Sequence, residues 1–229
     1  MKSIKYVCLA VLLSTVMLAQ APASKPAANT DVYHVHFTKA ALGKAAELGR
    51  ALATVDSSAP MPGHFIVLRH QEGDEWDYVV IEHLGTKATV DASPSTTPPS
   101  VRDLSAWHGD TFVAGPSWKD FTREMGIGEN ASKTANAVYI VSTYRAAPGH
   151  RDQLEKTLSP VAGGKIETGN VMMQHLEGGP WNFLTLTRYN SWQDLASDRS
   201  APSNADGWNQ TRENATFHRD TIADRVFPK

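Results

Sequence analysis

The chain contains one long sequence unit twice, and this duplication constrains its fold more than any other feature. The constant-spacing matches are Val32-Tyr33 with Val138-Tyr139, Gly43 with Gly149, Leu48 with Leu154, Leu52 with Leu158, Val55 with Val161 and Gly63 with Gly169. Two motifs also recur at nearby spacings: His70-x-Glu72-Gly73-x-x-Trp76 as His175-x-Glu177-Gly178-x-x-Trp181, and Trp107-His108-x-Asp110-Thr111 as Phe217-His218-x-Asp220-Thr221. A unit this long is a small domain, so the sequence predicts two similar domains packed together.

Residues 1–23 are typical of an export signal. Lys2 and Lys5 give a basic start, residues 6–18 are almost wholly apolar, and Ala21-Pro22-Ala23 offers a cleavage site. An uncleaved anchor is the alternative, but the apolar run is short for a membrane span. We therefore expect a periplasmic or extracellular protein that begins with a loose tether, residues 24–30.

The composition excludes several kinds of site and partner. Cys8 is the only cysteine and lies inside the signal, so the mature chain has no disulfide, zinc-thiolate site or cysteine nucleophile. Loss of Lys2 and Lys5 changes the formal charge from −2 to −4, because residues 1–23 contain no acid. A mildly acidic chain without a basic stripe argues against nucleic acid as a partner. No second apolar stretch has membrane length, so no stable membrane insertion is expected after cleavage.

Periodicity predicts the same elements in both halves. Residues 32–38 alternate as in a strand, and residues 43–56 place Leu48, Leu52 and Val55 on one helical stripe. Residues 65–68 and 78–81 form two strands around a turn at Gly73. Each half thus runs strand, helix, strand, strand, helix, the order of a ferredoxin-like unit. No fourth strand is evident; residues 120–125 and 225–229 are weak candidates.

The predicted fold class is α+β. Residues 31–125 and 136–229 form two tandem ferredoxin-like units, joined by a linker at residues 126–135. A sheet covered by helices on one face leaves its other face apolar and uncovered. We expect the two units to pack sheet to sheet as a pseudo-twofold barrel, either as a monomer or within a homodimer.

This element order, together with Tyr189-Asn190-Ser191-Trp192-Gln193-Asp194-Leu195 at a strand exit, resembles the dimeric α+β barrel superfamily, best known for antibiotic-biosynthesis-monooxygenase-like proteins. The resemblance covers nearly the whole mature chain as two fused units. It implies the fold and a range of activities that includes cofactor-independent oxygenases, haem-degrading enzymes, isomerases and lyases. No catalytic residue set of one branch aligns with this sequence, so none is carried over.

His34 and His36 stand two apart on the first strand, so they point to one face. Two imidazoles at this spacing can share a metal, with His70, Glu82 or His83 as a third ligand. The second half has Ile140 and Ser142 instead. Polar strand residues with local hydrogen bonds are the simpler interpretation. We therefore expect no cofactor, with haem or a divalent metal at His34 and His36 as the alternative.

The segment around His108 is predicted to be helical. On a helix, His108 shares a face with Leu104 and Thr111, whereas Asp110 lies roughly opposite, so no direct His–Asp pair is expected. His108 and its counterpart His218 are candidates for an acid or base. Their retention in both halves favours a structural role.

The His70–Trp76 motif and its copy bracket hairpin turns, which also favours a structural role. Alternatively Trp76 and Trp181 line a barrel mouth and stack on a flat ligand, with Trp107, His70 and His175 as further ligand-binding candidates. The sequence lacks a phosphate-binding glycine loop, a Gly-x-Ser-x-Gly elbow, a His-Glu-x-x-His motif and a Cys-x-x-Cys-His haem site.

The leading hypothesis is an exported barrel that binds a small, flat, apolar or aromatic molecule in a mainly apolar cavity and oxidises it without a cofactor. His34, His36, His108 and His218 are the candidate catalytic residues, with an imidazole as the base. One alternative is a non-catalytic binding or assembly module with structural histidines. The other is a haem- or metal-handling protein.

Overall fold

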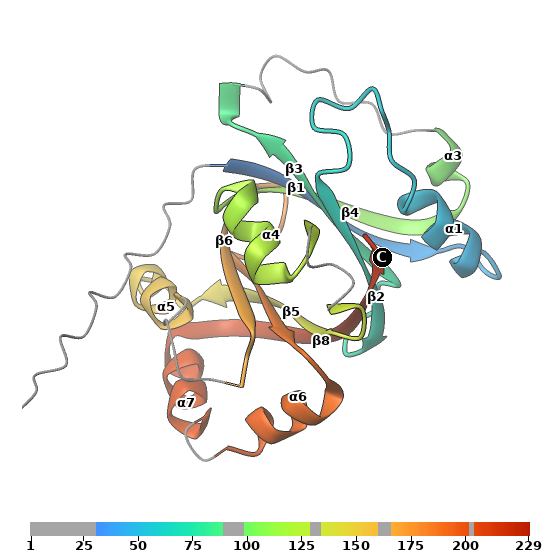
Figure 1. Cartoon of the computed structure of the whole chain (residues 1–229). Helices are drawn as coiled ribbons and strands as arrows, with labels where there is room; N and C mark the ends of the chain where they lie inside the picture. Colours follow the sequence, from blue (N-terminus) through green and yellow to red (C-terminus); the bar gives the residue numbers. More distant parts are fainter. Residues whose placement is uncertain (1–30, 89–98, 129–133, 160–165, 202–203) are drawn as a thin grey trace, which may run out of the picture.

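The computed structural model describes residues 31–88, 99–128, 134–159, 166–201 and 204–229 (Figure 1). The expected export signal, the tether and residues 129–133 of the expected linker lie outside these ranges. No helix in the described part of the chain combines the length and apolar character that crossing a membrane requires.

Each half of the chain folds into a four-stranded antiparallel sheet with helices. The first unit contains β1 (Asp31–Ala40), α1 (Ala45–Leu52), β2 (Phe65–Glu72), β3 (Tyr78–Gly85), α3 (Pro99–Arg102), β4 (Ser105–Gly115) and α4 (Trp118–Met125). The second contains β5 (Val138–Ala146), α5 (Arg151–Leu158), β6 (Gly169–Glu177), β7 (Phe183–Tyr189), α6 (Trp192–Arg199), α7 (Asn204–Asn214) and β8 (Ala215–Phe227). The strand orders β4-β1-β3-β2 and β8-β5-β7-β6 are the same, which confirms two tandem ferredoxin-like units.

Both units have the fourth strand that the sequence analysis did not find. The segments around His108 and His218, expected to be helical, form the first halves of β4 and β8. Of the two strand candidates, residues 120–125 lie in α4, whereas residues 225–227 form the end of β8. Polar residues and Gly109 interrupt the apolar alternation of β4, so its sequence carries little strand signal.

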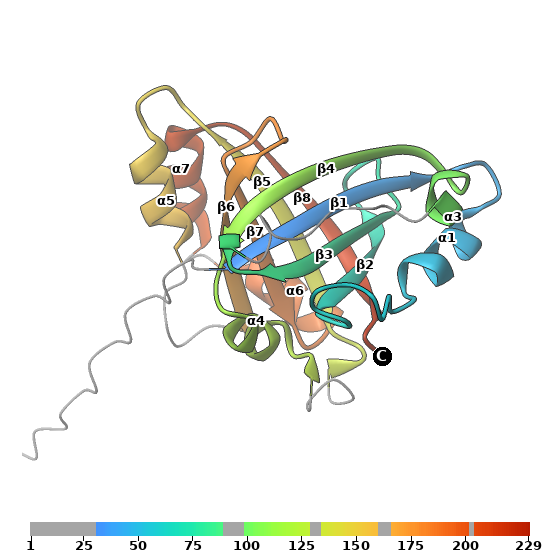
Figure 2. The same cartoon turned by 90° about the horizontal axis from the view of Figure 1, so that it is seen from above.

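The two sheets join edge to edge at two seams and close into one eight-stranded barrel (Figure 2). Strand β2 pairs with β8 at one seam, and β4 pairs with β6 at the other. The turn glycines lie at these seams. Gly73 has φ +125°, and a Cβ on it would lie 2.3 Å from the carbonyl oxygen of Asp220. Gly178 has φ +107°, and a Cβ on it would lie 2.5 Å from the carbonyl oxygen of Asp110. These contacts explain why the glycine occurs in both halves.

The barrel interior is filled with side chains. One residue in two along each strand points inward, as the pleat requires, and on β1 these residues are Tyr33, Val35 and Phe37. They belong to a buried cluster that runs through both units and includes Phe121 and Met125 of α4. Helix α4 follows directly after β4 and closes that end of the barrel. The opposite end carries the two hairpin turns.

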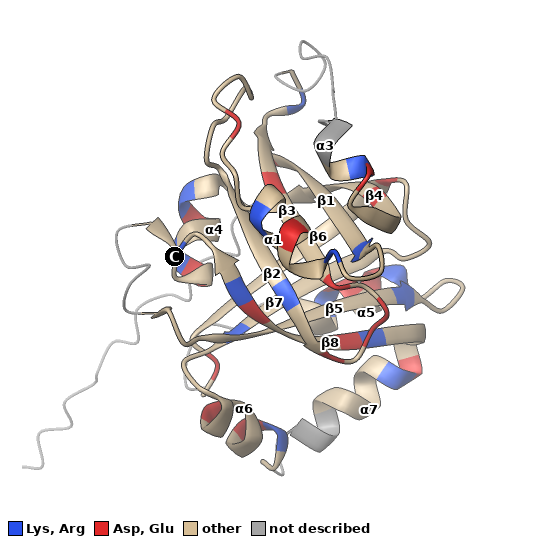
Figure 3. Cartoon of the chain, turned by 90° about the vertical axis from the view of Figure 1, so that its right-hand side faces the viewer, with Lys and Arg blue, Asp and Glu red and all other residues tan. Residues whose placement is uncertain are grey.

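The remaining helices cover the outer surface (Figure 1). Leu48 of α1 packs on the outside of the first sheet, and Leu154 of α5 takes the equivalent position on the second. Both leucines are fully buried, as the repeated helical stripe predicts. Helices α6 and α7 complete the cover of the second sheet. Figure 3 shows acidic and basic residues interspersed over one side of the molecule.

Candidate functional site

His34 and His36 lie on the outer face of the barrel, because their neighbours Tyr33, Val35 and Phe37 occupy the inside. The antiparallel pairing of β1 with β4 places His36 opposite Asp110, and pairing with β3 places His34 opposite Glu82. Residues paired across a sheet share a face, so all four side chains lie on one outer surface.

The carboxylate of Asp110 is the centre of this cluster. Its Oδ1 lies 2.9 Å from Nε2 of His34 and 2.6 Å from Nδ1 of His36. Its Oδ2 lies 2.8 Å from Nδ1 of His108. Glu82 Oε2 stands 3.8 Å from the other ring nitrogen of His34, an ion-pair distance longer than a hydrogen bond. We call these five residues the histidine cluster.

The His108–Asp110 contact corrects the helical expectation. Residues two apart point to opposite sides of a helix but to the same side of a strand, so β4 brings His108 and Asp110 together. The metal-ligand expectation is also only partly met. Glu82 lies beside His34, whereas His70 and His83 point into the barrel. His83 pairs there with Asp31 at 2.9 Å, and its ring lies 5.1 Å from that of Tyr33 at a tilt of 51°.

Charge interactions between the imidazoles and the carboxylates stabilise the histidine cluster. Burial of the His34 ring lowers its pKa, but the carboxylates of Asp110 and Glu82 outweigh burial and raise the pKa of His34 to about 9. Hydrogen bonds from His34 and then His36 hold the pKa of Asp110 well below its usual range. At neutral pH the cluster therefore contains an imidazolium beside an ionised carboxylate.

The cluster also offers a metal-donor set. Within the described part of the chain, one ligand atom each from His34, His36 and Asp110 lie within 4.8 Å of one another. Two imidazoles and a carboxylate suit zinc, iron, nickel or copper better than magnesium or calcium.

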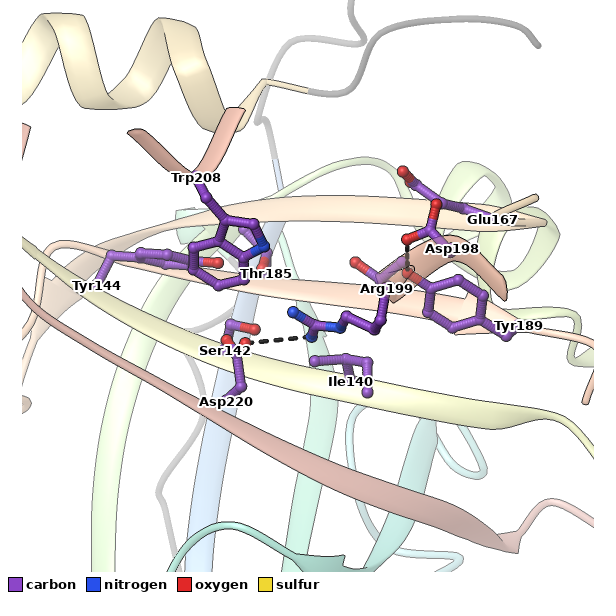
Figure 4. Close-up of a pocket in the computed structure, with 11 residues that line it drawn as sticks. Ile140, Ser142, Tyr144, Glu167, Thr185, Tyr189, Asp198, Arg199, Trp208 and Asp220 are labelled. Atoms are coloured by element: carbon purple, nitrogen blue, oxygen red, sulfur yellow. Dashed lines mark hydrogen bonds and ion pairs between the residues drawn. The ribbon is translucent and has the colours of Figure 1, made fainter. Parts of the chain in front are cut away.

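The equivalent outer surface of the second unit contains a cavity of about 140 Å³ beneath α6 and α7 (Figure 4). Ile140 and Ser142 occupy the positions of His34 and His36, and Asp220 takes the position of Asp110. Arg199 of α6 pairs with Asp220 at 3.1 Å, where the first unit has imidazoles.

Aromatic side chains line this second-unit cavity. Tyr144 and Trp208 form part of its wall, and the Arg199 guanidinium stacks over Trp208 at 5.4 Å. His218 packs against Trp208 and Tyr144, with ring centroids 4.9 and 6.0 Å apart, and is not among the residues that line the cavity. No local sequence motif marks Trp208 or Arg199, so the sequence alone does not identify either as a cavity residue.

A separate cavity of about 220 Å³ lies at the open end of the barrel, between the hairpin turns. The aromatic residues that line it are Phe37, Trp76, Trp107, Trp181 and Phe217. Both units contribute, so the cavity lies where the repeats meet. We call it the aromatic cavity. Its polar wall groups include the ion pair between Asp74 and Arg219, at 2.6 Å.

The structure thus brings Trp76, Trp107 and Trp181 together, as the ligand-binding hypothesis requires. His70 and His175 support this wall from behind, with ring centroids 5.6 Å from Trp76 and 5.3 Å from Trp181. His175 Nε2 accepts a hydrogen bond from the backbone N–H of Gly179, a structural contact within the hairpin.

The aromatic cavity and the histidine cluster lie on opposite faces of β4. Gly109 and Thr111 face the cavity side, whereas His108 and the Asp110 carboxylate face outward. His34 and His36 are therefore not among the residues that line the aromatic cavity. The alternation of β1 places them on the other side of the barrel wall.

Replacement of Asp110 by asparagine tests the electrostatic description. Asp110→Asn removes a charge that raises the pKa of His34, so this pKa should fall from about 9 toward its usual 6.5, as NMR titration of the ring would show. Because the pKa of His34 is higher in the folded chain than in the unfolded chain, protonation of its ring stabilises the fold. This stabilisation is fully present below about pH 6.5 and is lost as the pH rises through about 9. The variant should therefore lose more unfolding free energy at pH 6 than at pH 10. An equal loss at both pH values would contradict the description.

No protein-family model and no curated protein sequence matches the chain. Solved structures share its fold. An anthrone oxidase-like protein aligns with a TM-score of 0.62 and 12% identity, over 90% of this chain and 97% of that one. A candidate monooxygenase from Lactobacillus acidophilus gives 0.59 and 10%, over 86% and 94%. Another from Fusobacterium nucleatum gives 0.56 and 10%, over 86% and 93%. The chain therefore shares the α+β barrel fold of these structures, with two ferredoxin-like units fused in one polypeptide.

Proposed function

We propose that the protein binds a small, flat, apolar or aromatic molecule in the aromatic cavity. The observation that carries this proposal is the convergence of three indoles and two phenyl rings, drawn from both units, on one cavity of about 220 Å³. Small-molecule sites are typically concave and lined by aromatic side chains, with a few polar groups that orient the ligand.

The exposure of the indoles indicates how such a ligand enters. Trp76 and Trp181 are 2% and 7% exposed and form the inner wall, whereas Trp107 is 45% exposed. A half-exposed tryptophan at a cavity mouth has a free ring face on which a flat molecule can stack. Arg219 and Asp74 at the same opening can hydrogen-bond a polar edge of the ligand.

Trp107 is the residue through which to test binding. Trp107→Ala should weaken the binding of anthraquinone roughly tenfold, because the stacking and burial of one indole contribute about 1.5 kcal/mol. The measurement is quenching of intrinsic tryptophan fluorescence on titration, with thermal unfolding as the check on folding.

Trp192→Ala is the matched control, since Trp192 is 53% exposed on α6 and is not among the residues that line the aromatic cavity. It should bind anthraquinone as the unaltered protein does. Equal affinity of the Trp107 and Trp192 variants would refute the assignment of the cavity.

A second candidate function is oxidation of the bound molecule, which the names of the structural neighbours favour. Loss of a proton from an activated CH₂ group gives an electron-rich carbanion that can react with O₂. The resulting hydroperoxide loses water to leave a ketone. For anthrone, C₁₄H₁₀O + O₂ gives C₁₄H₈O₂ + H₂O, which balances without a further reductant.

We assign the base in this reaction to His108. It follows Trp107 directly in β4, and its side chain is 57% exposed. Its ring lies on the outer side of β4, so this role requires that the bound molecule extend from the aromatic cavity around the rim of the barrel, past the half-exposed Trp107, to the imidazole. The hydrogen bond of Nδ1 with Asp110 orients the ring and supports protonation at Nε2, as in other carboxylate–histidine pairs.

Oxygen uptake in the presence of anthrone, corrected for the rate without protein, tests this assignment. His108→Ala should lower the rate at least about 100-fold, the usual contribution of a general base, while binding of anthraquinone persists. His218→Ala is the control from the same repeat position, and its rate should be unchanged.

The outcomes separate the candidate functions. Binding without protein-dependent oxygen uptake would identify a non-catalytic binding module and refute oxidation alone. Equal rates for the His108 and His218 variants would refute His108 as the base.

A further inference from the structure

We propose that His34, His36 and Asp110 form a binding site for one divalent transition-metal ion on the outer face of the first unit. This inference goes beyond small-molecule binding and is independent of it, because the aromatic cavity lies on the other face of β4. The ligand atoms are Nε2 of His34, Nδ1 of His36 and Oδ1 of Asp110.

The spacing of these atoms suits a metal. Metal–ligand bonds of about 2.0–2.1 Å in tetrahedral geometry separate neighbouring ligand atoms by about 3.3 Å. The carboxylate oxygen lies 2.9 Å from one imidazole nitrogen and 2.6 Å from the other. Side-chain shifts of less than about 1 Å would therefore admit an ion of this size. The three ligands come from two adjacent strands, which fix their relative positions.

Surrounding residues hold the ligands in place. Glu82 Oε2 lies 3.8 Å from Nδ1 of His34, the nitrogen that would not face the metal. Nδ1 of His108 bonds Oδ2 of Asp110, the oxygen that would not bind it. Carboxylates behind histidine ligands and donors behind carboxylate ligands are typical outer contacts of metal sites. In the proposed arrangement His108 stays outside the coordination sphere.

The donor set defines the class of ion. Two imidazoles and one carboxylate favour zinc, iron(II), nickel or copper over magnesium, which prefers oxygen ligands. Three protein ligands leave at least one coordination position for water or another small ligand. The cluster is partly open to solvent, with 26% of the His34 and 40% of the Asp110 side chain exposed, so this position is accessible.

The second unit offers an internal comparison. Asp220 occupies the position of Asp110, but Ile140 and Ser142 replace the two imidazoles. Arg199 supplies the positive charge that Asp220 faces. The duplicated position thus has a metal-donor set in one unit and an internal ion pair in the other. This difference provides a matched control within one chain.

The test is isothermal titration of the untagged, chelator-treated mature protein with ZnCl₂, and separately with MgCl₂. The proposal predicts one zinc per chain and no magnesium binding at comparable concentrations. Asp110→Asn and His36→Ala should weaken zinc binding at least about 100-fold. Glu82→Gln, which alters only an outer contact, should weaken it about tenfold. Asp220→Asn should bind zinc as the unaltered protein does.

Thermal unfolding without metal shows whether each variant is folded. If a variant of a metal ligand does not fold, the tenfold loss of zinc affinity expected for Glu82→Gln still tests the proposal. Zinc affinity that is no higher than that for magnesium would overturn the proposal. So would equal zinc affinity of the Asp110 and Asp220 variants. Because no substrate is present, neither result bears on the aromatic cavity or on oxidation.

Discussion

Burial of the two apolar sheet faces is the constraint on which this structure depends. Helices cover only the outer face of each four-stranded sheet, so the inner faces must cover each other. They do so by joining at both edges, which also leaves no exposed sheet edge. Closure sets the direction of every side chain along the strands. Once Tyr33 and Val35 point inward, His34 and His36 must point outward.

The same constraint separates the two candidate sites. At the open end of the barrel, aromatic side chains at five inward positions converge at the boundary between the units, where they line a cavity. Outward positions of the first unit carry imidazoles and carboxylates. Duplication supplied two equivalent outer surfaces, and these have diverged. One gathers His34, His36 and His108 around Asp110, and the other places Arg199 and Trp208 around Asp220.

Much of the fold follows from the repeated sequence alone, because buried helical stripes and hairpin turns have local signatures. Leu48 and Leu154 are buried as their spacing predicts, and Gly73 turns as expected. The fourth strand was missed for a physical reason. Gly109 and Thr111 point inward near the barrel mouth while His108 and Asp110 point outward, so neither face of this segment reads as apolar.

The sequence therefore predicts only part of the candidate site. The two-residue spacing of His34 and His36 places them on one face in any strand. Their partner Asp110 is distant in sequence and becomes visible only when β4 pairs with β1. The convergence of Trp76, Trp107 and Trp181 likewise depends on closure of the barrel, which no local pattern encodes. In contrast, the glycine of each hairpin motif indicated a turn directly, and the positive φ of Gly73 and its close contact with the opposite unit agree with this.

The most direct test is to ask which side of β1 faces solvent. Because Cys8 is the only cysteine, a Cys8→Ser variant has no thiol, and a single cysteine can then be introduced at a chosen position. His34→Cys should react with a maleimide in the native protein, whereas Val35→Cys, at a position that is 0% exposed, should react only after unfolding. The reverse pattern would place the histidines inside the barrel and contradict the account.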